Sequence, residues 1–281
     1  MSAEIDIEGE SKENQAGMKV WFIGAGPGDP DLITVKGRDL IAQADAILFT
    51  GSLVSETVMR WSKASCKISD SKGMTLEEIN HWLIEKAKTN KTVIRLQTGD
   101  PSLYGVLIEI IQALDKEGID SSIVPGVSSA LAAAAAAKET LTLPEVTQTV
   151  ILSRVEGRTP MPEGESLEEL ASHHATLCLF LSITLLHKVK EGLLNAGWSE
   201  DAPIVVVHKA SWPGQEKIIR GTISTIQEKC KAEGITSQAM IIASPTLGAR
   251  EFDEIKKSRL YAQEFNHKFR VKNSNRRVKT S

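Results

Sequence analysis

The stretch VWFIGAGPGDPDLIT, residues 20–34, decides the fold of this 281-residue chain. It starts with a short apolar run typical of a buried strand, and Gly24, Gly26 and Gly28 follow at once. Glycine lets a backbone turn sharply and approach a ligand closely, because it has no Cβ. The stretch therefore predicts a strand that ends in a ligand-binding turn, with a tight turn that binds nothing as the alternative.

Asp29 and Pro30 distinguish this turn from a phosphate-binding turn. A dinucleotide fingerprint needs its third glycine where Asp29 stands, at the start of a helix that meets the pyrophosphate. A carboxylate there repels phosphate, and no later Gly-Lys-Ser/Thr supplies the lysine of a P-loop. The turn is better suited to a neutral or cationic ligand.

Short β-type runs alternate with helical stretches through the first half of the chain, which indicates repeated β-α units and a largely parallel sheet. We expect strands at 20–24, 46–50, 92–99 and 121–126, and helices at 75–90 and 103–118. In the second helix, Ile108, Ile111 and Leu114 form the expected apolar face, and Gly118 is the expected C-cap.

The pattern changes after the alanine-rich stretch 129–137, which predicts a closely packed helix. Strands are expected at 147–154, 176–182, 203–211, 217–224 and 238–245, with only two or three helices between them. This ratio predicts a mixed sheet and a second α/β domain. The expected organisation is an acidic tail at 1–17, α/β domains at 18–125 and 126–250, and a basic extension at 251–281.

Composition excludes several classes of protein. The chain has no apolar run of about 18 residues, and its acidic N-terminus lacks the apolar core of a signal peptide, so we expect a cytoplasmic protein without a membrane partner. A net charge of −3 does not indicate a nucleic-acid partner. Cys66, Cys178 and Cys230 are odd in number and far apart, which favours reduced thiols over disulfides or a protein-bound metal.

Two further turns follow predicted strands, QTGDPSLYG at 97–105 and PGVSS at 125–129. In an open parallel sheet, ligands bind at the carboxyl ends of the strands. The three turns together therefore predict one binding crevice.

These motifs, together with QTVILSRVEGRTPMPEGE at 148–165, resemble those of the tetrapyrrole (precorrin) methyltransferase family. The resemblance runs from about residue 18 to 270 and implies two α/β domains with the active site between them, S-adenosylmethionine as cofactor and a homodimer. Within the family, GSLVSE at 51–56, NAGWSED at 195–201 and VVVHKASWPGQ at 205–215 resemble members that methylate carbon 11 of the ring during cobalamin synthesis.

The resemblance also implies a set of cofactor contacts. They are Pro27, Gly99, Asp100, Leu103, Ser128, Ser129, Leu181, Ala210, Pro245 and Thr246. The last two stand in SPTLGAR, which departs from the family's pattern. Relatives often carry an acid where this chain has Gly51, so no role for such a carboxylate is assigned at that position.

Methyl transfer from a sulfonium to a ring carbon needs in-line placement and a dry site more than a strong acid or base. A tetrapyrrole carries many carboxylates around a flat apolar ring, and guanidinium groups bind carboxylates in a bidentate manner. Arg154 and Arg158 are therefore the first candidates for substrate contacts, followed by Lys36, Lys209 and Arg95. For each, the alternative is a surface charge or a structural ion pair.

Three other functions stay open at this point. An enzyme of the oxygen-dependent pathway would methylate the same ring without its metal, since the ring and not the protein would hold cobalt. An NAD-dependent oxidoreductase would use the glycine turn as a damaged fingerprint, against which Asp29 argues. A tetrapyrrole carrier without catalysis would need no cofactor pocket, so the turns at 97–105 and 125–129 argue against this function.

Overall fold

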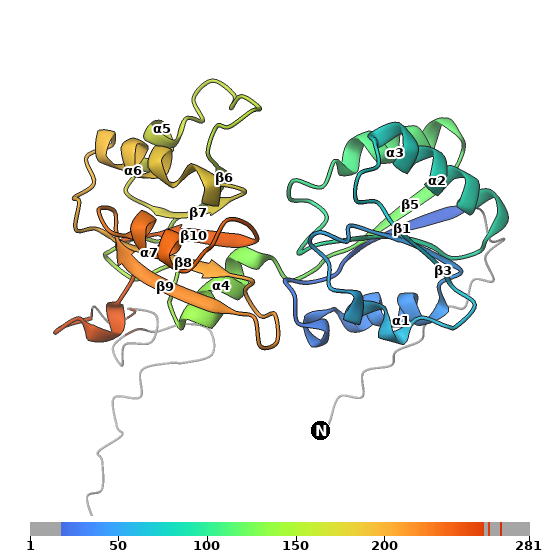
Figure 1. The fold of residues 1–281 in the computed structure, drawn as a ribbon, viewed down its shortest axis with the longest axis horizontal. Helices are drawn as coiled ribbons and strands as arrows, with labels where there is room; N and C mark the ends of the chain where they lie inside the picture. The colour runs from blue at the N-terminus through green and yellow to red at the C-terminus, as the bar shows by residue number, and fades with distance from the viewer. Residues whose placement is uncertain (1–17, 256–257, 259–264, 266–281) are drawn as a thin grey trace, which may run out of the picture. The chain divides into compact units, whose positions relative to one another are not determined.

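The computed structural model describes residues 18–255, 258 and 265. These residues belong to two compact units, which meet in the sequence between Ser128 and Ser129 (Figure 1). Each unit is built on one five-stranded sheet with helices packed against it. The predicted fold class, two α/β domains, is thereby confirmed. The predicted tail 1–17 and most of the predicted extension 251–281 lie outside the described residues.

The first unit contains a fully parallel sheet with strand order β3-β2-β4-β1-β5. Its strands are β1 Lys19–Gly24, β2 Ala46–Phe49, β3 Lys67–Asp70, β4 Val93–Gln97 and β5 Asp120–Val124. The helices between them are η1 Pro30–Leu32, α1 Val35–Gln43, η2 Glu56–Trp61, α2 Leu76–Thr89 and α3 Leu107–Lys116.

Helices cover both faces of this sheet, because alternate strand residues point to opposite sides and both sets are apolar. Ile23, Ile47 and Ile94 pack with α1 and η2 on one face. Phe22 and Leu48 pack with α2 and α3 on the other face. Figure 1 shows α2 and α3 on the side of this sheet opposite α1. The four remaining strands were predicted, whereas β3 was missed because this edge strand is mostly exposed and carries no apolar run.

The helix α3 corrects one prediction and confirms another. Ile108, expected on the apolar face, is 61% exposed, whereas Ile110 and Leu114 are buried against the sheet. The helix begins only at Leu107, after Val106 in a left-handed conformation, and this start sets which side faces the sheet. Gly118 ends the helix as expected, with a φ of +67° and its N–H donating to the Asp115 carbonyl.

The second unit contains the predicted mixed sheet, with strand order β6-β7-β10-β8-β9. Only β6 and β7 pair in parallel, and the other neighbours are antiparallel. The strands are β6 Val150–Arg154, β7 Thr176–Phe180, β8 Pro203–His208, β9 Lys217–Thr222 and β10 Ala239–Ala243. The helices are α4 Ser129–Ala137, α5 Leu167–Ala171, η3 Ile183–Leu185, α6 Leu186–Asn195, α7 Ile226–Ala232 and η4 Ala249–Glu251.

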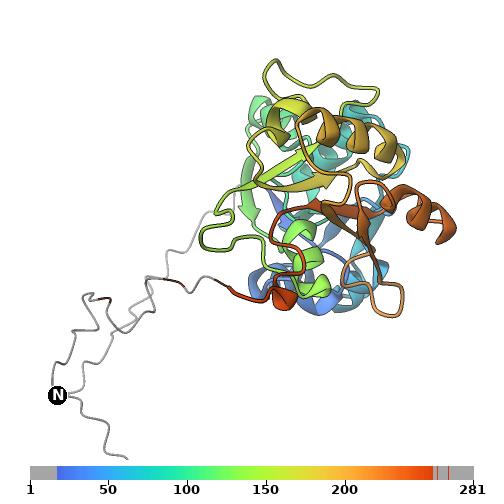
Figure 2. The ribbon, with the colours of Figure 1, turned by 90° about the vertical axis from the view of Figure 1, so that its left-hand side faces the viewer.

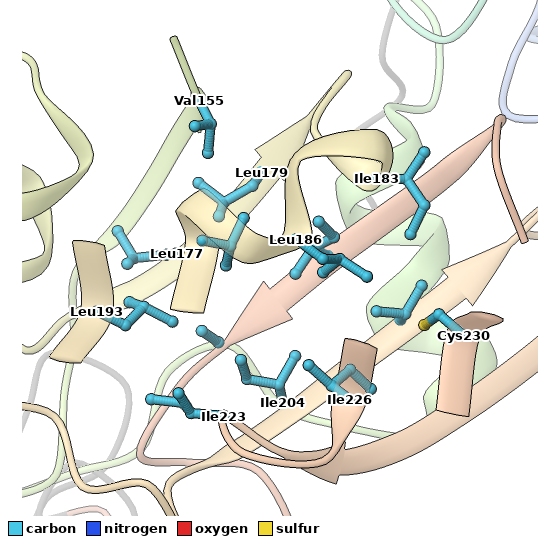
Figure 3. Close-up of a cluster of buried hydrophobic side chains, with 14 of the residues drawn as sticks. Val155, Leu177, Leu179, Ile183, Leu186, Leu193, Ile204, Ile223, Ile226 and Cys230 are labelled. Carbon is cyan, nitrogen blue, oxygen red and sulfur yellow. The ribbon is translucent and has the colours of Figure 1, made fainter. Parts of the chain in front are cut away.

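Two helical layers enclose this sheet. Side chains of α5, α6 and α7 pack with Leu177, Leu179 and Ile204 in one buried cluster (Figure 3). The alanine-rich α4 contacts β8 and β10 and lies on the other side of the strands from α6 (Figure 2). Among the described residues no helix is long and apolar enough to cross a membrane.

The three cysteines are free thiols, as expected. Cys178 and Cys230 are buried, and burial raises the pKa of the Cys178 thiol to about 12. A thiol with such a pKa stays protonated at neutral pH, so Cys178 acts as a small apolar side chain of the core.

Leu177→Ala tests the core of the second unit. Leu177 is fully buried within the cluster of Figure 3, so the substitution should lower the free energy of unfolding by about 2 to 5 kcal/mol. Leu152→Ala, at a 42% exposed position on the neighbouring strand, should cost less than about 1 kcal/mol. Urea unfolding followed by circular dichroism measures both, and similar losses for the two variants would contradict this assignment of the core.

Candidate functional site

The three predicted turns meet at one edge of the first sheet. They follow β1, β4 and β5, which are neighbouring parallel strands whose carboxyl ends lie together. Gly26 donates its N–H to the Gly99 carbonyl at 3.3 Å, and Gly99 donates to the Gly26 carbonyl at 2.8 Å. Gly126 donates its N–H to Asp100 Oδ2 at 2.9 Å. The turns are therefore joined to one another by hydrogen bonds, as a single site at this edge requires.

Gly24 and Gly126 have a more specific structural role than the sequence predicted. A Cβ on Gly24 would lie 2.5 Å from the Gly99 carbonyl oxygen, and a Cβ on Gly126 would lie 2.1 Å from the same atom. Both distances are far below van der Waals contact, so no other residue fits. These two glycines let the turns approach one another, whereas the expectation had been close approach to a ligand.

Asp29 has a structural role that explains why this turn differs from a phosphate site. Its Oδ1 accepts a hydrogen bond from the Asp31 N–H at 2.9 Å and caps the short helix η1. The longer helix α1 starts only at Val35, capped by the Thr34 hydroxyl. No long helix therefore begins directly after the glycine turn, where a dinucleotide-binding protein would place the helix N-terminus that holds its pyrophosphate.

Asp100 connects two of the turns. Oδ1 accepts the Ser102 N–H at 2.9 Å and the Ser102 hydroxyl, while Oδ2 accepts the Gly126 N–H. Partial burial raises the pKa of the Asp100 carboxyl, whereas the hydrogen bonds from Ser102 and Gly126 lower it. The hydrogen bonds together have the larger effect, so the pKa of Asp100 lies below its ordinary value. Asp100 is therefore an ionised tether between the β4 and β5 turns at neutral pH.

The remaining cofactor candidates of the first unit lie in these same turns. Pro27 is buried directly after the Gly26 contact, and Leu103 is half-buried with its N–H donating to the Asp100 carbonyl at 3.3 Å. Ser128 and Ser129 are half-buried and lead from the β5 turn into α4. The structure therefore brings Pro27, Gly99, Asp100 and Leu103 together.

The candidates of the second unit fall into two separate groups. Leu181 and Ala210 follow β7 and β8, whose ends lie at the same edge of the mixed sheet. Leu181 is 64% exposed with a φ of +55°, whereas Ala210 is buried. Pro245 and Thr246 lie at the opposite edge, because β10 runs antiparallel to both strands.

Thr246 has an evident structural role at that opposite edge. It is fully buried, and its Oγ1 donates to the Thr140 carbonyl at 2.6 Å and bonds to the Ser244 hydroxyl at 2.8 Å. Ser244 in turn bonds to the Thr176 hydroxyl. The structure therefore does not place Pro245 and Thr246 with Leu181 and Ala210.

The arginines after β6 differ in what they contact. Arg154 Nη1 and Nη2 donate to the carbonyls of Thr159 and Pro160, at 3.1 and 2.7 Å. This side chain holds the shape of its own loop. Arg158 is exposed on that loop, and no hydrogen bond joins its guanidinium to another residue in the described part of the chain.

Two predicted lysines contact aromatic rings. Lys36 Nζ lies 5.5 Å from the ring centroid of Trp21, and Lys209 Nζ lies 5.3 Å from that of Trp212. Lys209 also donates to Gln215 Oε1 at 2.6 Å, so it is occupied within its own hairpin. Cation–π contacts of this kind add modest local stability.

Arg95 is the least accessible of the predicted substrate contacts. It stands in the middle of β4 with only 4% of its surface exposed. Its guanidinium donates to Ser71 Oγ at 2.8 Å and to Thr50 Oγ1 at 3.2 Å. This burial leaves little of the guanidinium accessible to a ligand carboxylate.

Sequence reasoning missed two polar residues at the same sheet edge. Gln97 is 95% buried at the end of β4, donates to the Gly105 carbonyl at 2.6 Å, and has its Oε1 buried without a partner. Its signal was a second polar residue, beside Arg95, in a short strand of otherwise apolar residues. Asp70, at the end of β3, gave no signal because β3 itself was not predicted. Among the described residues no group of three or more His, Cys, Asp or Glu could hold a metal ion.

The fold and these turns define a class of protein: a two-domain α/β protein whose parallel sheet ends in joined glycine turns that do not suit phosphate. Comparison with known families agrees with this class. The model of the Tetrapyrrole (Corrin/Porphyrin) Methylases matches residues 19–227, and the chain belongs to that family of methyltransferases.

Two relatives show how far the similarity extends. The chain is 50% identical to the cobalt-precorrin-4 C(11)-methyltransferase of Priestia megaterium over 253 residues, covering 90% of this chain and 98% of that protein. It is 45% identical to the precorrin-4 C(11)-methyltransferase of Pseudomonas aeruginosa, covering 90% and 99%.

Solved structures extend this similarity to the fold. An X-ray structure of a cobalt precorrin-4 methyltransferase matches with a TM-score of 0.78 at 52% identity, over 81% of this chain and 95% of that one. The uroporphyrin-III C-methyl transferase of Thermus thermophilus, complexed with S-adenyl homocysteine, matches with a TM-score of 0.68 at 26% identity, over 83% and 100%.

Asp100→Asn tests the ionised tether. The pKa of Asp100 is lower in the folded chain than its ordinary value of 3.8, so its contribution to stability is present above that value and is lost as the pH falls through the folded pKa. Wild type should therefore be more stable than the variant at pH 7, and this difference should shrink progressively as the pH falls below 3.8. Urea unfolding across this range measures it, and an unchanged difference at low pH would count against the tether.

Proposed function

We propose that this protein is an S-adenosylmethionine-dependent methyltransferase that methylates carbon 11 of cobalt-precorrin-4, giving cobalt-precorrin-5A in cobalamin biosynthesis. The observation that carries the proposal is the 50% identity to a cobalt-precorrin-4 C(11)-methyltransferase over nearly the whole length of both chains. The joined turns of the first sheet supply a site of suitable chemistry.

The charges of the turns fit this cofactor. The stretches 24–29, 97–105 and 124–129 contain no lysine or arginine and include the carboxylates of Asp29 and Asp100. Such a site disfavours phosphates and favours a ligand with positive charge, such as a sulfonium. The buried Gln97 Oε1, which lacks a partner, adds an acceptor beside the turns. Pro27, Gly99, Asp100 and Leu103 would hold the cofactor at these turns.

The cofactor, when bound, supplies a methyl group on a positively charged sulfur. The turns would hold it in one position through backbone atoms, which the glycine contacts and the Asp100 tether keep rigid. Rigid backbone groups position the reactants without cost at the moment of reaction. The buried Pro27 would help to exclude water.

Arg158 is the predicted cation whose guanidinium is most available to bind a carboxylate arm of the tetrapyrrole. It is exposed, and its loop is held by the Arg154 contacts with Thr159 and Pro160. We assign Arg154 to positioning this loop, and we keep Lys36 and Lys209 as secondary candidates. Arg95 is not among the proposed direct contacts, because its guanidinium is buried.

A second candidate is the same methylation on the metal-free ring. The 45% identity to a precorrin-4 C(11)-methyltransferase favours it to a similar degree. Parallel assays with the cobalt-containing and the metal-free ring decide between the two. The homodimer implied by the family resemblance and the cytoplasmic location expected from the sequence are likewise proposals. Light scattering would test the homodimer.

Calorimetric titration tests the cofactor assignment. S-adenosylhomocysteine should bind with a dissociation constant in the micromolar range, and NADH should not bind detectably. Addition of S-adenosylmethionine and cobalt-precorrin-4 should then give a product heavier by one methylene, as measured by mass spectrometry. Binding of NADH alone, or no methylated product with either form of the ring, would refute the proposed function.

Arg158→Ala tests the substrate assignment. Loss of one bidentate contact with a carboxylate should raise KM for the tetrapyrrole about tenfold, while the affinity for S-adenosylhomocysteine stays within about threefold. Arg250→Ala is the matched control, because Arg250 is also exposed but lies next to the opposite edge of the same sheet. A similar rise in KM for both variants would show only a general effect of charge.

A further inference from the structure

A second group of polar residues lies at the carboxyl edge of the first sheet, where β2 and β3 end. Asp70 is the last residue of β3, and its side chain is exposed. Its Oδ1 accepts the N–H groups of Gly51 and Lys72, both at 2.8 Å. No hydrogen bond joins Oδ2 to another residue in the described part of the chain. Asp70 is therefore a carboxylate with one oxygen fixed by the backbone and the other open.

Gly51 makes room for this carboxylate. A Cβ at position 51 would lie 2.2 Å from Asp70 Oδ2, so the carboxylate occupies the space that a side chain of residue 51 would fill. The φ of Gly51 lies outside the left-handed region, so the backbone alone would accept another residue. Position 51 therefore has to be glycine because the Asp70 carboxylate lies beside it.

Arg95 stands behind this group as a buried positive charge. Its Ser71 and Thr50 partners follow β3 and β2, so the guanidinium reaches toward the same edge as Asp70. Burial lowers the pKa of Arg95 to about 10, and the Asp70 charge acts to raise it. No carboxylate in the described residues lies within ion-pair distance of Arg95. Asp70 therefore contributes the opposite charge from a longer distance.

Two buried polar atoms on β4 mark this edge as incomplete. Arg95 Nε and Gln97 Oε1 are both buried without a hydrogen-bond partner. The two residues are alternate positions of one strand, so their side chains lie on the same face. Buried polar groups in native proteins are nearly always satisfied, by protein, water or a ligand. A donor and an acceptor left unpaired here indicate that the edge is completed by something outside the chain.

The strand order places this group close to the glycine turns. β3 and β4 are separated only by β2, and neighbouring strands lie about 4.8 Å apart, so the ends of β3 and β4 are roughly 10 Å apart. A ligand the size of a tetrapyrrole bound at the turns can span that distance. Asp70 therefore lies within reach of a substrate bound at the same edge.

The reaction creates a need for such a carboxylate. An electron pair of the ring forms the new bond to the methyl carbon, and the bond from that carbon to sulfur breaks with its electron pair remaining on sulfur. The sulfur becomes neutral and the ring gains one positive charge. The ring returns to its original charge only if it loses a proton.

We propose that the Asp70 carboxylate accepts this proton from the ring, with Arg95 as a positioning residue whose hydrogen bonds hold Thr50 and Ser71, the chain neighbours of Gly51 and Asp70. The proposal rests on the function proposed above and names the proton acceptor for that reaction. The proton passes to Oδ2, which has no other hydrogen bond, while Oδ1 stays bound to the Gly51 and Lys72 amides.

Asp70→Asn tests the proposal in the full chain. The amide keeps the size of the side chain but cannot accept the proton, so kcat should fall at least about a hundredfold. The affinity for S-adenosylhomocysteine should stay within about threefold, and the melting temperature should change little. Asp39→Asn is the matched control, an exposed carboxylate of the same unit that bonds to Arg38, and it should leave kcat unchanged.

A relocated carboxylate separates chemistry from structure. Asp70→Ala should be as slow as Asp70→Asn, and Gly51→Asp in the same chain should recover kcat to within about tenfold of wild type. The reason is that a side chain at position 51 points into the space that Oδ2 occupies. Recovery supports the proposal, whereas a slow but folded double variant would overturn it.

Arg95 is tested through its dependence on Asp70. Arg95→Lys should lower kcat about tenfold in wild type but less than about twofold in the Asp70→Asn background, because its effect passes through that carboxylate. Equal effects in both backgrounds would overturn the positioning role. An unchanged kcat in Asp70→Asn would overturn the assignment of Asp70 as the proton acceptor, while the proposed function would still stand. A wild-type chain that methylates neither ring would overturn both.

Discussion

The close backbone contact between the turns after β1, β4 and β5 is the constraint on which the rest of this structure depends. Gly24, Gly99 and Gly126 approach so closely that a single added carbon on two of them would collide with the Gly99 carbonyl. This packing brings three carboxyl ends into one surface and fixes the position of Asp100 between them. The site is therefore built by the main chain, and side chains only adjust it.

Most of the fold follows from the sequence, because apolar periodicity and turn residues report local structure directly. Nine of the ten strands in the described part of the chain were predicted, and the parallel and mixed character of the two sheets followed from the spacing of the elements. The exception, β3, is an edge strand whose residues face solvent. Without a buried face it has no apolar pattern, so its place beside β2 is set by tertiary pairing alone.

The candidate site was predictable to a smaller degree. The turns were recognised because glycine, proline and aspartate cluster in them, and their convergence followed from strand order. The hydrogen-bond partner of each charged side chain was not predictable. Arg154, Lys209 and Arg95 bond to groups whose positions depend on the folded structure. Residue type indicated only that each of these side chains is a cation. The contacts in the structure then showed that Arg158 is exposed, whereas Arg154, Lys209 and Arg95 already bond to other groups of the chain.

The joining of the turns also has a consequence for how the protein acquires its site. Gly24 and Gly126 are about a hundred residues apart in the chain, so their contact closes a long loop and requires β1 and β5 to pair in register. No isolated fragment such as the first β-α unit can carry the site. Ligand binding is therefore coupled to the folding of the whole first unit, and a bound ligand stabilises that unit by mass action.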